Sequence, residues 1–552
     1  MQIASQTMAT KVNVLVRSKT ISPWLLTLLS ALLLTLGYNQ AFFDSLQDFA
    51  TRPLTAKLTA LLFLINLFLC HLGGLGKWQK PWLILLFLVS ASSQYFMLNY
   101  GILIDKDMLV NAMETDVAEV NALLSYKMLP YMLFHWLLPA MLVAVVPLSV
   151  KPRQPLKRAI MRYSLPLALT LALTALLVAT QYQSYASVFR EYRQLKHQVL
   201  PLSALSASVS LLRVKSATAT THQYFAEDAV QQLPPEAKPR LVIMVLGETV
   251  RADHLGINGY SRNTTPRLAK RELINFGAIS ACGTATAVSV PCLFSYLTQN
   301  NYDDTTAKHA DNLLDVLQRA GVKVIWRNNN SGCKSMCDRV EQDTGFALNS
   351  SYQCKDGECP DLALLAGLEQ KIAQQNSAQS LFIVLHQQGN HGPEYYKRSL
   401  EQHKVFLPEC RTNLLSDCDQ QQIINAYDNA IVSTDMLLDN GISLLERLSK
   451  KYDTGLLYVS DHGESLGENG VYLHGLPYWI APQAQTKVPM LLWLSNSLHR
   501  SLTLDNKCLQ MKENVSHDNL FHTVLSLFSV TSVDINTTLN LLNGCSNTGL
   551  AS

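Results

Sequence analysis

The first third of the chain contains five long apolar segments. They cover residues 22–43, 54–75, 81–101, 131–150 and 160–183. Each is close to the roughly 20 residues that a helix needs to cross a bilayer. A cleaved signal peptide would account for the first segment alone, so five segments predict a retained transmembrane domain of five helices over residues 1–185. The composition agrees, because 48% of the residues are hydrophobic and only 16% are charged.

Basic residues between the apolar segments predict the orientation of this domain. Lys77 and Lys80 lie between the second and third segments, and the linker between the fourth and fifth is also basic. Loops rich in lysine and arginine stay in the cytoplasm. The loop over residues 102–130 is acidic, as expected on the opposite side. An odd number of spans then places everything after residue 185 outside the cytoplasm.

Cysteines support an oxidising location for the second half of the chain. Of 11 cysteines, only Cys70 precedes residue 230. An even and closely spaced set predicts disulfides. Proximity suggests four pairs and elimination a fifth: Cys282–Cys292, Cys333–Cys337, Cys354–Cys359, Cys410–Cys418 and Cys508–Cys545. The alternative for Cys333 and Cys337 is a metal site, although no second cysteine or histidine pair lies nearby.

The acidic loop over residues 102–130 has the pattern of a helix lying on a membrane. Leu109, Met113 and Val117 are spaced for one helix face. Its polar side offers Asn111, Glu114 and Thr115, which form either a solvated face or part of a lipid head-group site. Residues 186–240 are polar and then rich in glutamine and proline, which predicts an interfacial helix and a linker.

Residues 241–552 have the pattern of an α/β domain. Short apolar runs at residues 241–246, 322–326, 381–386, 456–460 and 488–494 alternate with helical stretches such as 311–320 and 420–450. This alternation predicts a mainly parallel sheet covered by helices on both faces. In such domains the functional site lies at the carboxyl ends of the strands.

Acidic and imidazole side chains follow several of these strands. Glu248 follows the first strand, His391 lies shortly after the third, and Asp461, His462 and His474 follow the fourth. Each could be an ordinary hydrogen-bonding loop residue, but several together favour a metal site. Oxygen ligands with a histidine suit zinc, and manganese stays an alternative.

A threonine-rich segment lies between the first two strands. Thr284 and Thr286 precede an apolar stretch with helical spacing. Either hydroxyl could simply cap that helix. A hydroxyl at a helix start can also lie beside backbone amides that stabilise phosphate and developing negative charge.

Several longer motifs resemble one family. They are GETVRADHLGINGY (247–260), CGTATAVSVPC (282–292), NNNSGCKSMCDR (328–339), GNHGP (389–393) and SDHGESLGENGVYLHGLPY (460–478). With the five-span domain, they resemble the membrane-bound phosphoethanolamine transferases that modify lipid A, in the alkaline phosphatase and sulfatase superfamily. This group includes the mobile colistin-resistance enzymes.

The resemblance implies specific roles for residues of this chain. It implies one or two zinc ions, with Glu248, Thr286, Asp461 and His462 as primary ligands and Thr286, rather than Thr284, as the nucleophile. A second zinc would involve His391 and His474, and the head-group pocket would be lined by Asn330, Ser331, Lys334, His391, Glu464 and His474. Without the resemblance, Lys334 would be a surface lysine. Lys334, His391 and His474 suit the balancing of charge on a reacting phosphodiester.

The resemblance also implies a reaction and a location. Thr286 would attack phosphatidylethanolamine, release diacylglycerol and pass phosphoethanolamine to a lipid A phosphate in a ping-pong reaction. The transferase would be a multi-pass protein of the bacterial inner membrane with a periplasmic catalytic domain, and we expect a monomer. The added ammonium would weaken attraction for cationic peptides such as polymyxins.

Four other functions compete with this interpretation. A sulfatase of the same superfamily calls for Cys-x-Pro-x-Arg, whereas Cys292 is followed by Leu293 and Phe294. A transferase acting on core heptose or on a periplasmic glucan is the nearest rival. A catalytically inactive lipid sensor is the rival from another class. A net charge of +3, without a basic arm interleaved with aromatic residues, argues against a nucleic-acid partner.

Overall fold

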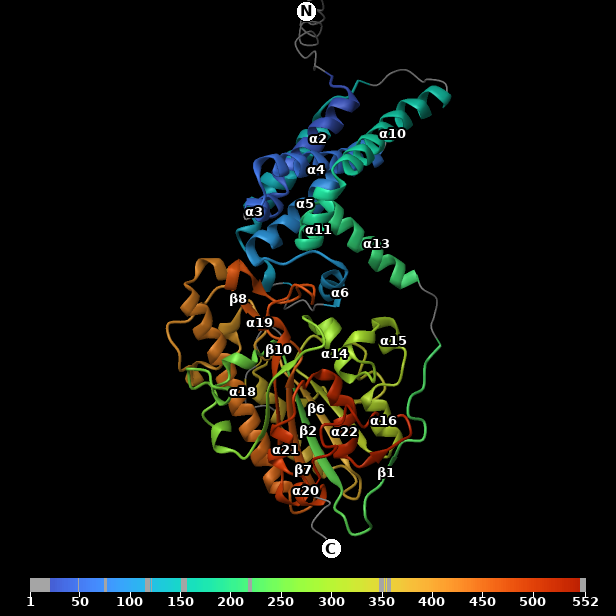
Figure 1. Cartoon of the computed structure of the whole chain (residues 1–552). Coiled ribbons are helices and arrows are strands. Elements are labelled where there is room, and N and C mark those ends of the chain that lie inside the picture. Colours follow the sequence, from blue (N-terminus) through green and yellow to red (C-terminus); the bar gives the residue numbers. More distant parts are fainter. Residues whose placement is uncertain are drawn as a thin grey trace, which may run out of the picture. The chain divides into compact units, whose positions relative to one another are not determined.

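The computed structural model divides the chain into two compact units. One comprises Met1–Leu98 with Tyr126–Val209, and the other Asn99–Ser125 with Ser210–Ser552. The structure describes residues 20–47, 49–73, 77–114, 120, 122–149, 156–216, 221–346, 352, 354 and 359–546. Below, the first is the membrane unit and the second the catalytic unit (Figure 1).

The membrane unit is helical. Four helices are long and apolar enough to cross a membrane: α4 (Arg52–Leu72), α5 (Gln79–Tyr100), the continuous stretch Met128–Val145 formed by α8, a π-helical turn and α9, and Tyr163–Thr180 within α10 (Leu156–Thr180). Leucines and phenylalanines stay exposed on these helices; Leu165, for example, is 64% exposed. Such exposure of large apolar side chains is expected where the solvent is lipid. The unit continues through α11 (Tyr182–Glu191) and α12 (Leu195–Gln198) into α13 (Leu202–Ser216).

The first predicted span is not one straight helix. It consists of α2 (Pro23–Gly37) and α3 (Gln40–Gln47), bent by 50°, and gives a fifth span only if the bent pair is counted as one. Polar side chains bind the backbone at the break. The Asn39 amide donates to the carbonyls of Leu34 and Leu200 at 2.8 and 3.1 Å, and the Gln94 side chain bridges the Gly37 carbonyl and the Gln40 amide, each at 3.1 Å. A continuous apolar pattern does not reveal such a bend.

The catalytic unit is built on a seven-stranded, mainly parallel sheet. The strand order is β3-β10-β7-β2-β6-β4-β5, and only β10 runs antiparallel to its neighbours. The strands are β2 (Arg240–Gly247), β3 (Ile274–Ser280), β4 (Lys323–Asn328), β5 (Glu341–Gln342), β6 (Leu381–His386), β7 (Asp453–Ser460) and β10 (Lys487–Leu494). All five predicted strands are present. Short pairs β1–β11 (Val230–Gln231, Val530–Thr531) and β8–β9 (Ser465–Leu466, Tyr472–Leu473) lie apart from this sheet.

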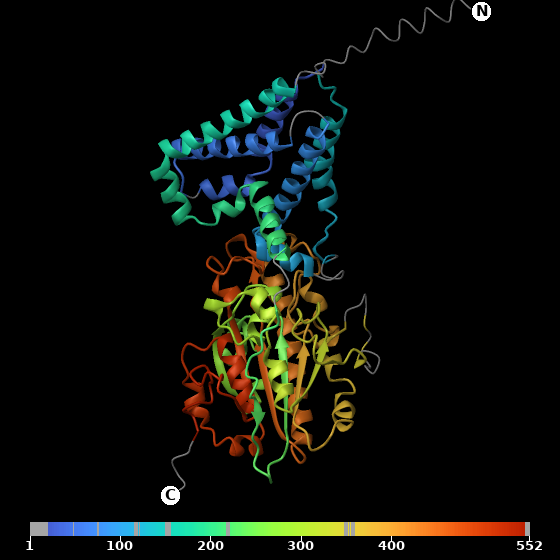
Figure 2. The same ribbon diagram turned by 90° about the vertical axis from the view of Figure 1, so that its right-hand side faces the viewer.

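Helices cover both faces of the sheet (Figures 1 and 2). The helices α14 (Thr286–Phe294), α16 (Leu313–Arg319) and α22 (Leu520–Leu527) share a buried core with alternate residues of β2 such as Val242 and Met244. On the other face, α18 (Gln420–Leu448) packs on β7, where Gly441 lies against Leu456. Both predicted helices are therefore present with shorter bounds. Shorter helices are α15 (Asp304–Lys308), α17 (Leu368–Ala373), α19 (Gln483–Thr486), α20 (Asn496–Ser501) and α21 (Asn506–Gln510).

The loop between α5 and α8 groups with the catalytic unit, whereas the sequence assigned it to the membrane domain. Its helix α6 (Lys106–Glu114) packs on α14. Gly101 lies so close to the β8–β9 loop that an added Cβ would be 3.0 Å from the Gly470 carbonyl oxygen. These contacts, between residues far apart in sequence, are the physical reason for the difference.

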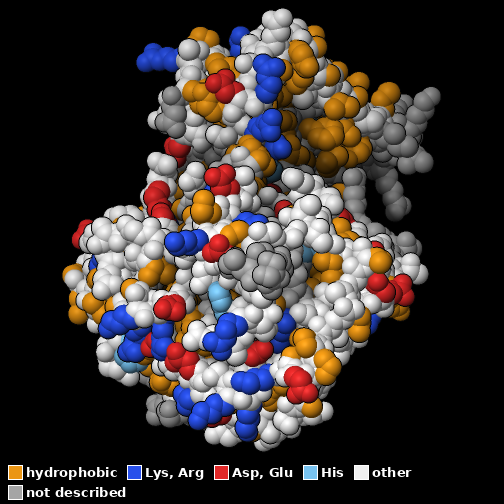
Figure 3. Space-filling model, turned by 60° about the horizontal axis from the view of Figure 1, so that its bottom comes forward, with side chains coloured by type: hydrophobic (Ala, Val, Ile, Leu, Met, Phe, Trp, Pro, Cys, Tyr) orange, Lys and Arg blue, Asp and Glu red, His pale blue; other side chains and the backbone are white. Residues whose placement is uncertain are grey.

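Charged side chains of both signs are interspersed over the catalytic unit on the face shown in Figure 3. Many charged side chains of this unit form ion pairs. Arg271, for example, lies 2.7 Å from Asp439 and 3.0 Å from Glu446. A mixed surface of this kind gives solubility without a strong field of one sign.

Candidate active site

Four predicted site residues meet at the carboxyl ends of two neighbouring strands. Glu248 follows β2, Asp461 and His462 follow β7, and Thr286 begins α14. Because β2 and β7 are adjacent and parallel, their ends lie side by side. Thr286 Oγ1 is 3.1 Å from both carboxylate oxygens of Glu248 and 3.3 Å from His462 Nε2. A hydroxyl, two carboxylates and an imidazole therefore form one cluster.

The backbone around Glu248 is tightly packed. Gly389 lies after β6 with a φ of +55°, and a Cβ added there would be 2.5 Å from the Glu248 carbonyl oxygen. The Asn390 amide donates to that same carbonyl at 2.9 Å. Glycine is needed for this conformation and this approach. The GNHGP motif therefore fixes the position of Glu248.

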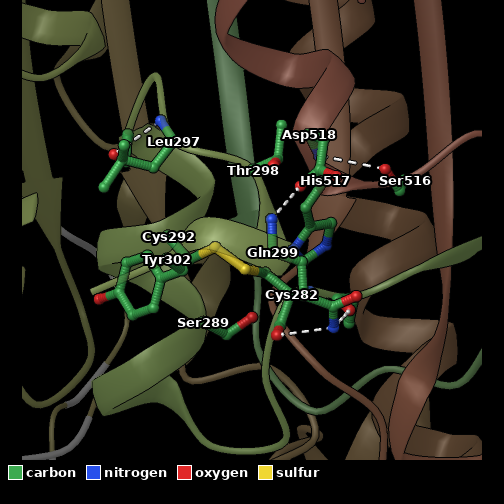
Figure 4. Close-up of a disulfide and its surroundings, with 12 residues drawn as sticks. Cys282, Ser289, Cys292, Leu297, Thr298, Gln299, Tyr302, Ser516, His517 and Asp518 are labelled. Carbon is green, nitrogen blue, oxygen red and sulfur yellow. Dashed lines mark hydrogen bonds between the residues drawn. A yellow bond between two sulfur atoms is a disulfide. The ribbon is translucent and has the colours of Figure 1, made fainter. Parts of the chain in front are cut away.

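The start of α14 is held by a disulfide and a buried histidine (Figure 4). Cys282 is bonded to Cys292, which ties the segment before the helix to the helix itself. His517 Nδ1 accepts a hydrogen bond from the backbone N–H of Cys282 at 3.1 Å, and the Nε2 of the same ring lies 2.9 Å from the Ser460 carbonyl oxygen. Burial lowers the pKa of His517 to about 3, so the ring is neutral and its Nε2–H donates. His517 thus joins the segment bearing Thr286 to the end of β7.

The cluster has the composition of a metal site. Ligand atoms of Glu248, Asp461 and His462 lie within 4.8 Å of one another, and all three residues are fully buried. Among the described residues, Asp461 Oδ2 has no hydrogen-bond partner. His462 Nδ1 lies 2.9 Å from the Gly463 carbonyl and donates to it, which leaves the Nε2 lone pair facing the carboxylates. These donors fit zinc.

The electrostatics of the cluster also favour a cation. Burial raises the pKa of Asp461, and the Glu248 carboxylate raises it further. Burial opposes ionisation of Glu248, but hydrogen bonding and charge from His462 leave its pKa below the usual range. For His462, burial is outweighed by the two carboxylates, which raise its pKa. The raised pKa values mean that Asp461 and His462 tend to keep their protons when no metal is bound. A bound dication would displace these protons.

A second group of side chains lies beside this cluster. The ring of His474 is 4.4 Å from that of His462 and 5.4 Å from that of His391. Glu464 uses both carboxylate oxygens within the protein, since Tyr395 donates to one at 2.6 Å and His474 Nδ1 lies 2.8 Å from the other. This carboxylate orients His474 and leaves its Nε2 as the available ring nitrogen.

Three further predicted residues follow β4. Asn330 donates to Glu248 Oε2 at 2.7 Å and to the Gln387 carbonyl at 2.8 Å. Lys334 is only 8% exposed, and its Nζ lies 3.0 Å from Ser331 Oγ and 3.2 Å from the Ser331 carbonyl oxygen. The NNNSGCKSMCDR motif therefore brings an amide to Glu248 and a lysine to the same side of the sheet.

Comparison with known proteins agrees with this geometry. The family model described as phosphoethanolamine transferase EptA/EptB matches residues 61–215, and the sulfatase family model matches residues 240–530. The chain is 40% identical to phosphoethanolamine transferase EptA of Escherichia coli K12 over 521 residues, covering 92% of this chain and 94% of that protein. The chain belongs to the phosphoethanolamine transferase family.

Two further relatives support this assignment. Phosphatidylethanolamine transferase Mcr-1 of Escherichia coli is 38% identical, with 93% of this chain and 96% of that protein covered. The solved structure of the integral membrane lipooligosaccharide phosphoethanolamine transferase A from Neisseria meningitidis superposes with a TM-score of 0.89 at 33% identity. That match covers 94% of this chain and 98% of the other. The likeness therefore includes both units of the transferase.

The loop residues of the transferase occupy different positions. Asn111 is buried on α6, and Glu114 ends that helix with its carboxylate 2.9 Å from Lys308 Nζ. The Glu114 carbonyl accepts a hydrogen bond from Lys334 Nζ at 3.0 Å. Thr115 lies outside the described residues. The carboxyl end of α6 therefore contacts Lys334 through a backbone carbonyl, which sequence spacing alone did not indicate.

The transferase contains five disulfides with the predicted pairing. They are Cys282–Cys292, Cys333–Cys337, Cys354–Cys359, Cys410–Cys418 and Cys508–Cys545, and Cys70 is a buried free thiol. The alternative of a metal site at Cys333 and Cys337 is therefore wrong, because both sulfurs are used in the bond.

Sequence reasoning missed two residues of the transferase site. His517 lies in a segment with no recognisable spacing to the other motifs, and its role depends on two backbone groups brought together by folding. Tyr395 follows His391 by four residues, so the GNHGP motif could have pointed to it. Its hydroxyl is fully buried against Glu464.

Proposed function

We propose that this transferase moves phosphoethanolamine from phosphatidylethanolamine to a phosphate of lipid A, through an ester on Thr286. Thr286 Oγ1 lies at the amino end of α14, 3.1 Å from both Glu248 carboxylate oxygens and 3.3 Å from His462 Nε2, and this position supports the proposal. A hydroxyl so placed is the one best able to attack phosphorus.

The reaction divides into two displacements. In the first, Thr286 loses its hydroxyl proton, a bond forms between its Oγ1 and phosphorus while the bond from phosphorus to the glycerol oxygen breaks, and diacylglycerol leaves as an alcohol by taking up one proton. In the second, a lipid A phosphate oxygen attacks the same phosphorus, the bond from phosphorus to Oγ1 breaks, and Oγ1 takes up a proton to restore the threonine hydroxyl. His474, held by Glu464, is placed to move a proton at the departing oxygen. Lys334 supplies a cation for the phosphate oxygens.

Zinc fits the buried donors of Glu248, Thr286, Asp461 and His462 and would supply the positive charge that favours a threonine alkoxide at neutral pH. His391 and His474 are the residues that would serve a second ion. Asn330 holds Glu248 in place through its hydrogen bond at 2.7 Å. The residues of the chain thus fix the orientation that the first displacement requires.

Membrane attachment suits two lipid substrates. The helices long enough to cross a membrane support a multi-pass protein, and we place it in the bacterial inner membrane with its catalytic unit in the periplasm. Five disulfides support an oxidising compartment. The relatives named for phosphatidylethanolamine and for lipooligosaccharide support the donor and the class of acceptor. The added ammonium group would reduce attraction for polymyxins.

Trapping of the ester tests the proposal. Full-length protein in detergent is mixed with phosphatidylethanolamine labelled in its ethanolamine, quenched in acid and digested for mass spectrometry. We expect the label on the peptide containing Thr286, together with released diacylglycerol, and no label in Thr286→Ala. Thr284→Ala is the matched control, because that hydroxyl donates to the Leu476 carbonyl at 2.6 Å instead of facing Glu248. Equal labelling of folded Thr286→Ala would overturn the covalent scheme.

A further inference from the structure

The loop between α5 and α8 contacts the rest of the catalytic unit near both of its ends. Near its start, Gly101 lies against Gly470 and Val471, and Met108 Sδ lies against Gly475. Near its end, the Asn413 amide donates to the carbonyls of Ala122 and Leu124 at 2.9 and 3.0 Å. Between these points α6 packs on α14, the helix that begins with Thr286. The loop therefore forms part of the surroundings of the active site.

Glu114, the last residue of α6, makes two contacts of different kinds. Its carboxylate Oε1 lies 2.9 Å from Lys308 Nζ on α15, and Lys308 is also 3.3 Å from Asp304. Burial opposes the charge on Lys308, but Asp304 and Glu114 outweigh it and raise the lysine pKa, so the side chain is cationic. The ion pair is only partly exposed, at 18% for Lys308 and 30% for Glu114. It fixes the carboxyl end of α6 to α15.

The second contact places the Glu114 carbonyl on the ammonium group of Lys334. An ammonium has three N–H donors, and Lys334 directs them at the Glu114 carbonyl, the Ser331 carbonyl and Ser331 Oγ, at 3.0, 3.2 and 3.0 Å. Two of these acceptors belong to Ser331, three residues before the lysine, and the Cys333–Cys337 disulfide closes the short loop that contains the lysine. The third comes from α6. Carbonyls at a helix carboxyl end carry partial negative charge and attract cations.

From these contacts we infer that Glu114 and Lys308 are positioning residues for Lys334: their ion pair holds the α6 carbonyl where it fixes the position of the lysine ammonium, whose positive charge then acts on the phosphate of the lipid donor. The Glu114 side chain thus acts by holding the Glu114 backbone carbonyl in place and does not itself contact the head group. This inference rests on the proposed function, because it assumes that Lys334 meets a substrate phosphate.

The ion pair can be broken without changing the backbone carbonyl. Glu114→Gln and Lys308→Met each remove it, Lys308→Arg retains the charge, and the double variant Glu114→Lys with Lys308→Glu reverses the pair. Lys323→Met is the matched control, because Lys323 pairs with Glu341 at 2.7 Å with similar exposure at a different edge of the same unit. All variants are made in the full-length protein and assayed in detergent micelles containing phosphatidylethanolamine together with lipid A, so that the enzyme turns over.

Initial rates of diacylglycerol release give the first readout. We expect Glu114→Gln and Lys308→Met to lower kcat by about 5- to 10-fold with a smaller change in KM, since the oriented cation acts mainly on the charge of the transition state. The Lys308→Arg and charge-reversed variants should recover at least half of the lost rate, and Lys323→Met should behave as the unchanged protein. A charge-reversed variant no faster than the single variants would overturn the inference.

Hydrogen exchange of α6 gives a readout that does not depend on activity. Without substrate, the amides of residues 106–114 should exchange faster in Lys308→Met than in the unchanged protein, and Lys308→Arg should restore protection. Equal exchange in all variants would also overturn the inference. If the unchanged protein itself released no diacylglycerol, the proposed function would fail instead, and the two failures are therefore distinguishable.

Discussion

Zinc should stabilise the folded protein, and Asp461→Asn should abolish that effect. In the metal-free protein, Glu248 and Asp461 are two fully buried carboxylates beside a single imidazolium, and Asp461 Oδ2 has no hydrogen-bond partner among the described residues. Replacing Asp461 by asparagine removes one of the two like charges while Oδ1 can still accept the amides of Thr249 and His462. The metal-free variant should therefore be at least as stable as the metal-free original.

The size of the zinc effect follows from binding linkage. A ligand that binds only the folded state adds about 3 to 4 kcal/mol when its free concentration exceeds Kd by 100- to 1,000-fold. A unit of roughly 350 residues has an unfolding entropy of about 0.7 kcal/mol/K, so the melting temperature should rise by about 4 to 6 °C. The melting temperature of the Asp461→Asn variant should rise by less than about 1 °C at the same zinc concentration.

Thermal melting of full-length protein in detergent measures this difference. Each protein is first dialysed against a chelator and then melted with and without added zinc. Asp435→Asn is the control, because Asp435 is a buried carboxylate on α18 that accepts hydrogen bonds from the backbone amides of Arg267 and Leu268 and is not one of the cluster residues. An equal zinc shift in Asp461→Asn and the unchanged protein would refute the assignment of Asp461 as a ligand.

Three further predictions concern residues around the site and in the core. Tyr395→Phe removes the hydroxyl bound to buried Glu464 and should lower the free energy of unfolding by about 1 to 3 kcal/mol, together with the transfer rate, as measured by melting and kinetics. Burial lowers the pKa of His522 to about 4, so below about pH 6.5 the unfolded chain takes up a proton that the folded protein does not. Stability should therefore fall by up to about 1.4 kcal/mol per pH unit between pH 6.5 and 4, and pH-dependent melts of His522→Gln should lack that contribution. Replacing both Cys282 and Cys292 by serine should cost about 2 to 3 kcal/mol of stability and make the melting temperature of this variant less sensitive to reductant.

Buried strands were the part of the fold best predicted from sequence. Those with continuous apolar runs, such as β2 and β6, are buried along their whole length. The edge strand β3 was missed because its sequence INFGAIS mixes polar and glycine residues and half-exposed positions. The antiparallel direction of β10 was also out of reach, because direction depends on connections rather than on local pattern.

Long-range contacts explain what the sequence could not predict about the site. Glu248, Asp461 and His462 could be proposed because each follows a strand end, and strand ends converge in parallel sheets. The position of α6 depends on tertiary contacts such as Glu114 with Lys308, which are 194 residues apart. No local sequence pattern predicts such a pairing. The hydrogen bonds of His517 to the backbone of Cys282 and of Ser460 could not be predicted for the same reason.

Mass spectrometry of lipid A measures whether the protein transfers phosphoethanolamine to lipid A and whether this transfer needs Thr286. Lipid A would be extracted from cells of a strain without endogenous modification that express the unchanged protein, Thr286→Ala or an empty vector. We expect a lipid A species heavier by one phosphoethanolamine group in the first culture alone. Lipid A of unchanged mass in cells that contain folded, membrane-inserted protein, or an equal mass increase with Thr286→Ala, would contradict the proposed function.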